Sequence, residues 1–136
     1  MKRRRNILVC DDDPGTRYIL KRILEREHDV NVVQSETGRE ALRLLAIGHF
    51  SLLILDLRMP GLDGIETLDA IRSCTPLQGL PVVVLTADSR VESVAQILAS
   101  GVTAFLLKPL NGERTRERLK AVLDGLDGRD ATRVAS

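Results

Sequence analysis

The chain of 136 residues alternates between short apolar runs and segments with the spacing of an amphipathic helix. Apolar runs of this length, with no strict polar alternation, are typical of strands that are covered on both faces. They occur at residues 7–10, 30–33, 50–55, 82–85 and 104–107. Strands that alternate with helices form a parallel sheet with right-handed crossovers. The pattern therefore predicts an α/β fold in three layers, a (βα)5 arrangement in one domain.

Each run is followed by a segment whose apolar residues recur every three or four positions, which predicts one buried helix face per segment. The five stripes are Leu20, Ile23 and Leu24; Ala41, Leu42 and Leu45; Ile65, Leu68 and Ile71; Val91, Val94, Ala95 and Leu98; and Leu119, Val122, Leu123 and Leu126. Thr37 and Glu40 have the spacing of a capping box. The pattern stops after Leu126, so we predict a domain over residues 1–126 and a polar tail, frayed or leading into a linker, over 127–136.

Composition argues against several classes of function. The 20 basic and 19 acidic residues give a net charge of +1, and aromatic residues make up 2%, so neither a basic DNA-binding surface nor a base-stacking platform is expected. No apolar run approaches the roughly 20 residues of a membrane span. The basic start is followed by only four apolar residues, 7–10, which is too few for a signal peptide. Cys10 and Cys74 form no metal-ligand or disulfide pattern. We expect a cytoplasmic protein with no direct nucleic-acid or membrane partner.

Polar residues follow four of the five predicted strands. In an open parallel sheet, ligands bind outside the carboxyl ends of the strands, which meet at one edge. The residues that reach this edge are Asp11, Asp12 and Asp13 after the first run, Asp56 after the third, Thr86 after the fourth and Lys108 after the fifth. Asp13 is the one expected to cap the following helix.

Crowded carboxylates repel one another unless a cation joins them, and hard oxygen ligands suit Mg2+. A lysine and a hydroxyl group nearby suit phosphoryl oxygens, and a carboxylate can carry a phosphoryl group as an acyl phosphate. Asp11 and Asp12 are adjacent and can hold one metal ion, whereas Asp56 stands alone before a loop rich in proline and glycine. This favours Asp56 as phosphoacceptor and the pair as metal ligands.

In residues 7–13, 53–64, 83–87 and 105–109 the chain resembles the receiver domain of two-component response regulators, over about residues 6–126. The resemblance implies a flavodoxin-like sheet of strand order 2-1-3-4-5. It also implies that Asp56 accepts the phosphoryl group with Mg2+ held by Asp11, Asp12, Asp56 and the backbone carbonyl of Arg58. Thr86 and Lys108 would bind the phosphoryl oxygens, Phe105 would turn inward as Thr86 moves, and the Lys108–Pro109 bond would be cis.

Partners follow from the same resemblance. A histidine kinase or a phosphotransfer protein would supply the phosphoryl group, and the domain would catalyse only its own phosphorylation and dephosphorylation. A downstream protein would bind the face made by the fourth helix, the fifth strand and the fifth helix. On this face Arg114, Arg116, Arg118 and Lys120 are basic and Asp88 and Glu92 acidic, charges able to pair across a homodimer of the phosphorylated form. Arg58 and Asp88 would overhang the site and tune the phosphoryl lifetime.

Three alternatives stay open on the sequence. A phosphatase of the haloacid dehalogenase type also uses Asp-x-Asp after its first strand, as in Asp11 and Asp13, but it leaves Asp56 unexplained. A dinucleotide or flavin module lacks its glycine-rich loop here. The chain can also be a receiver cut from a longer regulator with a separate output domain.

Overall fold

The computed structural model describes residues 4–59, 64–87, 90–99 and 101–135. Its core is a parallel sheet of five strands in the order β2-β1-β3-β4-β5. The strands are β1 (Arg5–Cys10), β2 (Val30–Ser35), β3 (Leu52–Asp56), β4 (Val82–Thr86) and β5 (Ala104–Leu107). The predicted fold class and strand order are confirmed.

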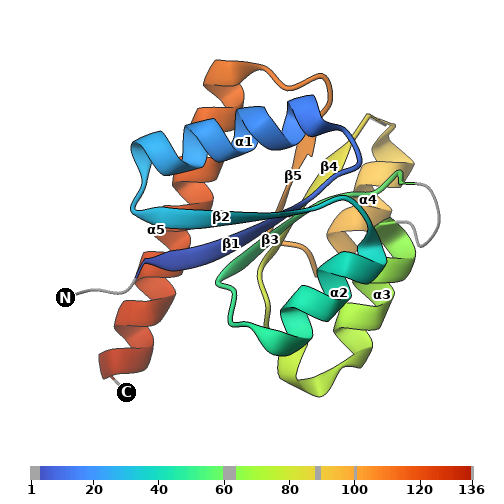
Figure 1. The fold of residues 1–136 in the computed structure, drawn as a ribbon. Helices are drawn as coiled ribbons and strands as arrows, with labels where there is room; N and C mark the ends of the chain where they lie inside the picture. The colour runs from blue at the N-terminus through green and yellow to red at the C-terminus, as the bar shows by residue number, and fades with distance from the viewer. Residues whose placement is uncertain (1–3, 60–63, 88–89, 100, 136) are drawn as a thin grey trace.

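Helices cover both faces of the sheet, which gives the three expected layers (Figure 1). They are α1 (Pro14–Glu27), α2 (Gly38–Ile47), α3 (Gly64–Ser73), α4 (Val91–Ala99) and α5 (Gly112–Ala135), with a 3-10 turn η1 (Thr75–Leu77) before β4. Helices α1 and α5 lie on one face, whereas α2, α3 and α4 lie on the other (Figure 1). Among the described residues, no helix is both long enough and apolar enough to cross a membrane.

The sheet divides the core into two apolar clusters. Alternate residues of β1 and β3 point to opposite faces, so Ile7 and Ile54 pack with α1 and α5 while Leu8 and Leu55 pack with α2 and α3. The central strands β1, β3 and β4 are buried nearly throughout, but the edge strands are only partly covered, and Leu107 of β5 is 41% exposed. The prediction that strands are covered on both faces therefore holds for the three central strands, and it holds only in part for the edge strands β2 and β5.

Side-chain caps start two of the helices where the sequence places them. The carboxylate of Asp13 accepts hydrogen bonds from the Gly15 N–H and the Thr16 hydroxyl at the start of α1. The Thr37 hydroxyl accepts a hydrogen bond from the Glu40 N–H at the start of α2. These contacts satisfy amide donors that have no partner within the first helical turn.

Cys10 behaves as the small buried residue that its position in an apolar strand predicts. Its thiol is inaccessible and donates a hydrogen bond to the Thr37 carbonyl. Burial raises the pKa of this thiol to about 11, whereas Cys74 is exposed.

The helix stripes are confirmed in part. All four predicted residues of α5 are buried, but Ile65 of α3 is 56% exposed and Leu98 of α4 is 49% exposed. In α3 the fully buried Thr67 replaces Ile65, and in α4 Ile97, rather than Ala95 or Leu98, packs partly against the core. The side chains of Val91, Val94 and Glu92 lie outside the described part of the chain.

The end of the chain differs from the irregular tail that the sequence predicts. Helix α5 continues to Ala135 instead of ending near Leu126. The apolar period does stop at Leu126, whose side chain is buried. Figure 1 shows the extra turns of α5 projecting beyond the sheet, past the end where β1 begins. A helix needs only its own backbone hydrogen bonds to continue, so loss of the apolar stripe does not by itself end it.

Candidate functional site

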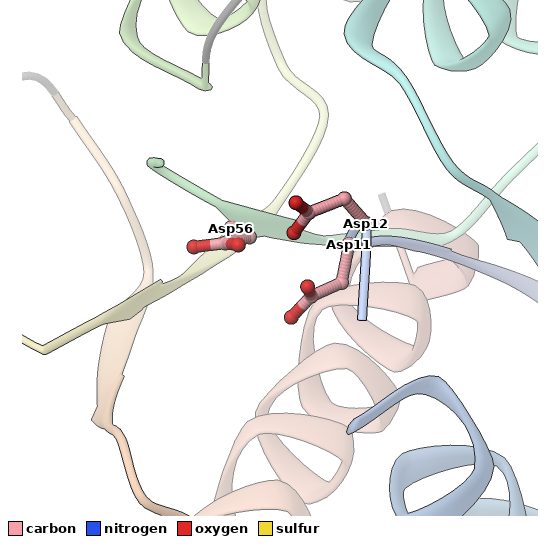
Figure 2. Close-up of side chains that lie close together, drawn as sticks. All are labelled: Asp11, Asp12 and Asp56. Carbon is pink, nitrogen blue, oxygen red and sulfur yellow. The ribbon is translucent and has the colours of Figure 1, made fainter. Parts of the chain in front are cut away.

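Strand register brings the two buried aspartates together. Strands β1 and β3 are neighbours, and Cys10 is paired with Leu55. The next residue of each strand, Asp11 and Asp56, therefore reaches the same point at the carboxyl edge of the sheet. Figure 2 shows the side chains of Asp11, Asp12 and Asp56 converging from the ends of these two strands.

The three carboxylates form a compact acidic cluster. One oxygen atom from each lies within 4.8 Å of the other two. Asp11 is fully buried and Asp56 is 3% exposed, whereas Asp12 faces solvent. Two buried carboxylates beside an exposed one offer oxygen ligands with room for water, which is the donor set that Mg2+ prefers. The cluster can therefore hold a divalent metal ion.

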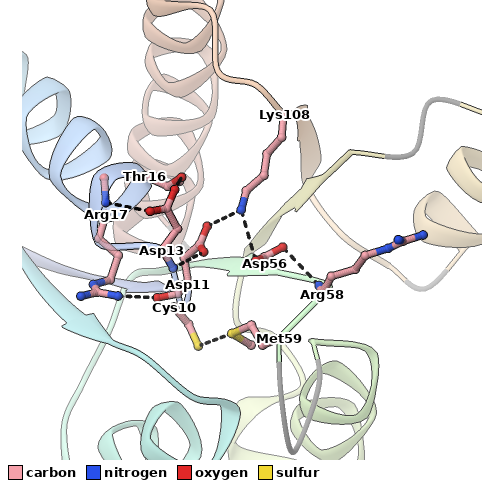
Figure 3. A network of polar contacts seen from close by, with 10 residues as sticks. Cys10, Asp11, Asp13, Thr16, Arg17, Asp56, Arg58, Met59 and Lys108 are labelled. Atoms are coloured by element: carbon pink, nitrogen blue, oxygen red, sulfur yellow. Dashed lines mark hydrogen bonds and ion pairs between the residues drawn. The ribbon is translucent and has the colours of Figure 1, made fainter.

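Lys108 links the two buried carboxylates, as Figure 3 shows. Its Nζ atom lies 2.8 Å from Oδ2 of Asp11 and 3.2 Å from Oδ2 of Asp56. Burial raises the pKa of the Asp11 carboxyl, and the ion pair with Lys108 offsets only part of that effect. Burial alone would lower the pKa of Lys108, but its ion pairs with Asp11 and Asp56 raise it. Lys108 is therefore held in its charged form between the two carboxylates.

Main-chain N–H groups donate hydrogen bonds to the second carboxylate oxygen, Oδ1, of Asp11 and of Asp56. The Asp13 N–H donates to Oδ1 of Asp11 at 2.9 Å, and the Arg58 N–H donates to Oδ1 of Asp56 at 3.2 Å. Each buried carboxylate thus accepts one amide hydrogen bond and one contact from Lys108. The exposed side chain of Arg58 points away from this network (Figure 3).

Thr86 and Lys108 come from neighbouring strands at the same edge. Thr86 ends β4 and is 5% exposed, and its carbonyl accepts a hydrogen bond from the Lys108 N–H at 2.8 Å. The peptide bond between Lys108 and Pro109 is cis, as the resemblance implies. The sequence is therefore correct in assigning Thr86 and Lys108 to the edge that carries the aspartates.

Phe105 lies on β5, at the boundary between the core and the surface. Its half-buried ring packs against the cluster on the face of α2, α3 and α4. The guanidinium carbon of Arg118 from α5 lies 5.9 Å from the ring centroid, within cation–π distance. Asp88, expected to face Arg58, lies outside the described residues.

Sequence reasoning missed Arg17, and it treated Gly64 only as part of a loop. Arg17 is 8% exposed and contacts the main chain of Asp11. A charged residue three positions before Leu20 and seven before Leu24 lies on the apolar stripe of α1, and that is the signal in the sequence. Gly64 packs against the main chain of Asp56 and Leu57, a contact that no local pattern reveals.

The family model for the response regulator receiver domain matches residues 7–120. The chain belongs to this family. Members of the family are signalling proteins rather than conventional enzymes, and they interact in general with histidine kinases and downstream targets. The match excludes the phosphatase and dinucleotide-binding alternatives for this receiver domain.

Relatives of known structure and function agree with the assignment. The receiver domain is 30% identical to the chemotaxis protein CheY of Pseudomonas aeruginosa over 122 residues, covering 90% of this chain and 98% of that protein. It is 36% identical to the transcriptional regulatory protein ZraR of Salmonella typhimurium, covering 87% of this chain but 26% of that regulator. The structure of the chemotaxis response regulator CheY4 of Vibrio cholerae superposes with a TM-score of 0.80 at 28% identity, covering 88% of this chain and 99% of that chain. The family thus includes both single-domain proteins and parts of longer regulators.

The contact of Gly64 with the main chain of Asp56 yields a prediction about the receiver domain's stability. A Cβ atom at position 64 would lie 2.2 Å from the Asp56 carbonyl oxygen and 2.4 Å from Cα of Leu57. Because both neighbours are backbone atoms, Gly64→Ala must displace the strand end that carries Asp56. We expect a loss of about 1–3 kcal/mol in the free energy of unfolding, measured by urea denaturation.

Gly79→Ala is the matched control, because a Cβ atom at position 79 meets no heavy atom within 4 Å. We expect this variant to keep or slightly increase the wild-type stability. Equal stabilities of the Gly64→Ala and wild-type proteins would show that the close approach is not a constraint on the site.

Proposed function

We propose that this receiver domain accepts a phosphoryl group on Asp56 from the phosphohistidine of a histidine kinase or phosphotransfer protein. The observation that carries the proposal is the convergence of three carboxylates with Lys108 at one edge of the sheet. Mg2+ would be held by Asp11, Asp12, Asp56 and the main-chain carbonyl of Arg58. When bound, this ion would offset the negative charge of the phosphoryl oxygens.

Asp56 supplies the nucleophile in this proposal. A carboxylate oxygen of Asp56 attacks phosphorus, a P–O bond forms, and the P–N bond to the donor histidine breaks with its electron pair returning to the imidazole. Lys108 donates a hydrogen bond to Oδ2 of Asp56 at 3.2 Å, so its ammonium group would lie beside a phosphoryl group carried on that residue. Lys108 would then pair with the phosphoryl oxygens, as would the hydroxyl of Thr86.

Access to the edge supports the same proposal. A hollow of about 510 Å3 lies between the start of α1 and the loop after β5, and its lining includes Lys108 but not Asp11, Asp12 or Asp56. Asp12, the exposed member of the acidic cluster, lies at the same edge. A phosphohistidine side chain approaching from solvent would meet these groups first.

The signal would leave through the face made by α4, β5 and α5. In our proposal Thr86 moves toward the phosphoryl group and Phe105 turns inward into the space that it leaves, which alters this face for a downstream protein or a second phosphorylated copy. Three of the four basic residues of α5 already have partners within the chain, because Arg116 pairs with Glu27 of α1, Lys120 pairs with Asp124, and Arg118 lies over the Phe105 ring. Arg114 is therefore the strongest of the four candidates for a contact across a homodimer. We place this function in the cytoplasm, without direct binding to nucleic acid or membrane.

The acceptor is tested by mapping the adduct formed with acetyl phosphate and Mg2+. We expect mass spectrometry to locate one phosphoryl group on Asp56 and none on Asp56→Asn. Asp13→Asn is the control, because asparagine caps a helix as well as aspartate does and should leave labelling intact. Wild-type labelling of Asp56→Asn would disprove the assignment.

The switch is tested with beryllofluoride, which mimics the phosphoryl group. A phosphoryl group adds roughly −1.5 to −2 charge and three acceptor oxygens, enough to bias a two-state arrangement. We expect the NMR signals of the Phe105 ring and of Arg118 to shift together on addition, and Thr86→Ala to suppress that shift. A single Phe105 rotamer in both states would refute the switch.

The phosphoryl lifetime is tested at Arg58 and Asp88. The Arg58 side chain points away from the carboxylates (Figure 3), and we propose that in the phosphorylated form it turns to pair with Asp88 across the mouth of the site and obstructs the line along which water attacks phosphorus. Arg58→Ala and Asp88→Ala should each shorten the lifetime, and the double variant should add little more. Equal lifetimes in all four proteins would exclude a lid of this kind.

A further inference from the structure

Arg17 is a buried cation on α1 that contacts the loop carrying the metal-binding aspartates. Its guanidinium makes three contacts, one to the residue that follows β1 and two to residues at the end of β2. One NH2 group donates to the main-chain carbonyl of Asp11 at 2.7 Å, a bond that Figure 3 draws, and Nε donates to Oε1 of Gln34 at 2.9 Å. The other NH2 group lies 3.5 Å from Oε1 of Glu36.

Charge pairing does not account for the burial of this side chain. Glu36 is the carboxylate in contact with it, but the Glu36 side chain is 70% exposed and the separation is long, so the pair contributes little. The short and buried contact is the one to the Asp11 carbonyl. The desolvation of the guanidinium is therefore balanced mainly by fixed hydrogen bonds to Asp11 and Gln34.

Arg17 donates its hydrogen bond to Asp11 at the point where the chain leaves the sheet. Asp11 is the first residue after β1, and its N–H donates to the carbonyl of Ser35, the last residue of β2. The guanidinium of Arg17 donates to the main-chain carbonyl of Asp11. With both of its main-chain groups bonded, Asp11 has a fixed peptide plane toward Asp12, and that plane fixes the position of the Asp12 backbone N–H at the end of β1.

We propose that Arg17 is a positioning residue for the metal-binding aspartates, holding the Asp11–Asp12 peptide so that both carboxylates face Asp56. Lys108 has a different part, because it contacts the carboxylates themselves. The inference rests on the proposed Mg2+ site, but it does not require that Asp56 be phosphorylated.

The experiment measures Mg2+ affinity directly, by NMR titration of the Asp12, Asp13 and Arg58 amides without any phosphoryl donor. Loss of a group that orients a metal ligand typically weakens metal binding about 10–100-fold. We expect about a tenfold loss in Arg17→Met and a similar loss in Arg17→Lys, since an ammonium group keeps the charge but lacks the fork that spans Asp11 and Gln34. Arg26→Met, an exposed position on the same helix, is the control and should bind as the wild type does.

Two further measurements separate positioning from folding. Saturating Mg2+ should restore the rate of acetyl phosphate labelling in Arg17→Lys, because a misplaced ligand weakens binding without removing the acceptor. If Arg17→Met does not fold, Gln34→Leu removes one acceptor of the guanidinium and should give an intermediate loss of Mg2+ affinity.

Unchanged Mg2+ affinity in the folded Arg17 variants would overturn the inference. Wild-type Mg2+ affinity in Arg17→Lys together with a loss in Arg17→Met would also overturn it. The positive charge at position 17, and not the geometry of the guanidinium, would then determine Mg2+ binding. A wild-type protein whose Asp12 amide does not respond to Mg2+ would overturn the metal site itself. A normal Mg2+ response without labelling of Asp56 would contradict the proposed acceptor and leave the role of Arg17 standing.

Discussion

Adjacent positions at the ends of β1 and β3 bring Asp11 and Asp56 within reach of one ammonium group. Two like charges about 5 Å apart repel by roughly 3 kcal/mol at an effective dielectric constant of about 20. Asp12 adds a third carboxylate within 4.8 Å. An arrangement of this kind is stable only when cations and amide donors surround it, which is the part played by Lys108 and by the N–H groups of Asp13 and Arg58.

The same constraint explains why the loops at this edge are tightly held. Arg17 binds the carbonyl of Asp11, and Gly64 leaves no room for a side chain against Asp56 and Leu57. Both contacts act on the main chain and not on the carboxylates. These main-chain contacts leave the carboxylate oxygens of Asp11 and Asp56 available to Lys108 and to the N–H groups of Asp13 and Arg58.

A short stretch of β5 connects the site with the surface of α5. Lys108 contacts the aspartates, and Phe105, three residues earlier, lies against Arg118. A change of partner at Lys108 can thus reach α5 through β5, and a change at Thr86 can reach it through the neighbouring pair β4 and β5. This proximity gives a physical basis for the proposed output face, because one segment carries both the ammonium group that would bind the phosphoryl oxygens in our proposal and the ring beside α5.

The sequence predicts well what depends on periodicity and strand ends. The order of the strands follows from the family resemblance, and the placement of Asp11, Asp56, Thr86 and Lys108 at one edge follows from parallel strands meeting there. The exposure of Ile65 and Leu98 could not be predicted, because a helix packed on one side of a twisted sheet buries a stripe whose position depends on its orientation. Arg17 was missed because its partners on Asp11 and Gln34 are assembled only by the fold. The length of α5 was missed because a helix continues without an apolar stripe.

We propose that the three carboxylates bind one divalent cation at this edge. A crystal of the protein soaked in Mn2+, an anomalous scatterer that accepts the same oxygen ligands as Mg2+, tests it directly. We predict one strong anomalous peak in contact with Asp11, Asp12 and Asp56, with Lys108 displaced from at least one carboxylate. Mn2+ bound elsewhere, with Lys108 still bridging Asp11 and Asp56, would show that these carboxylates are not the metal site.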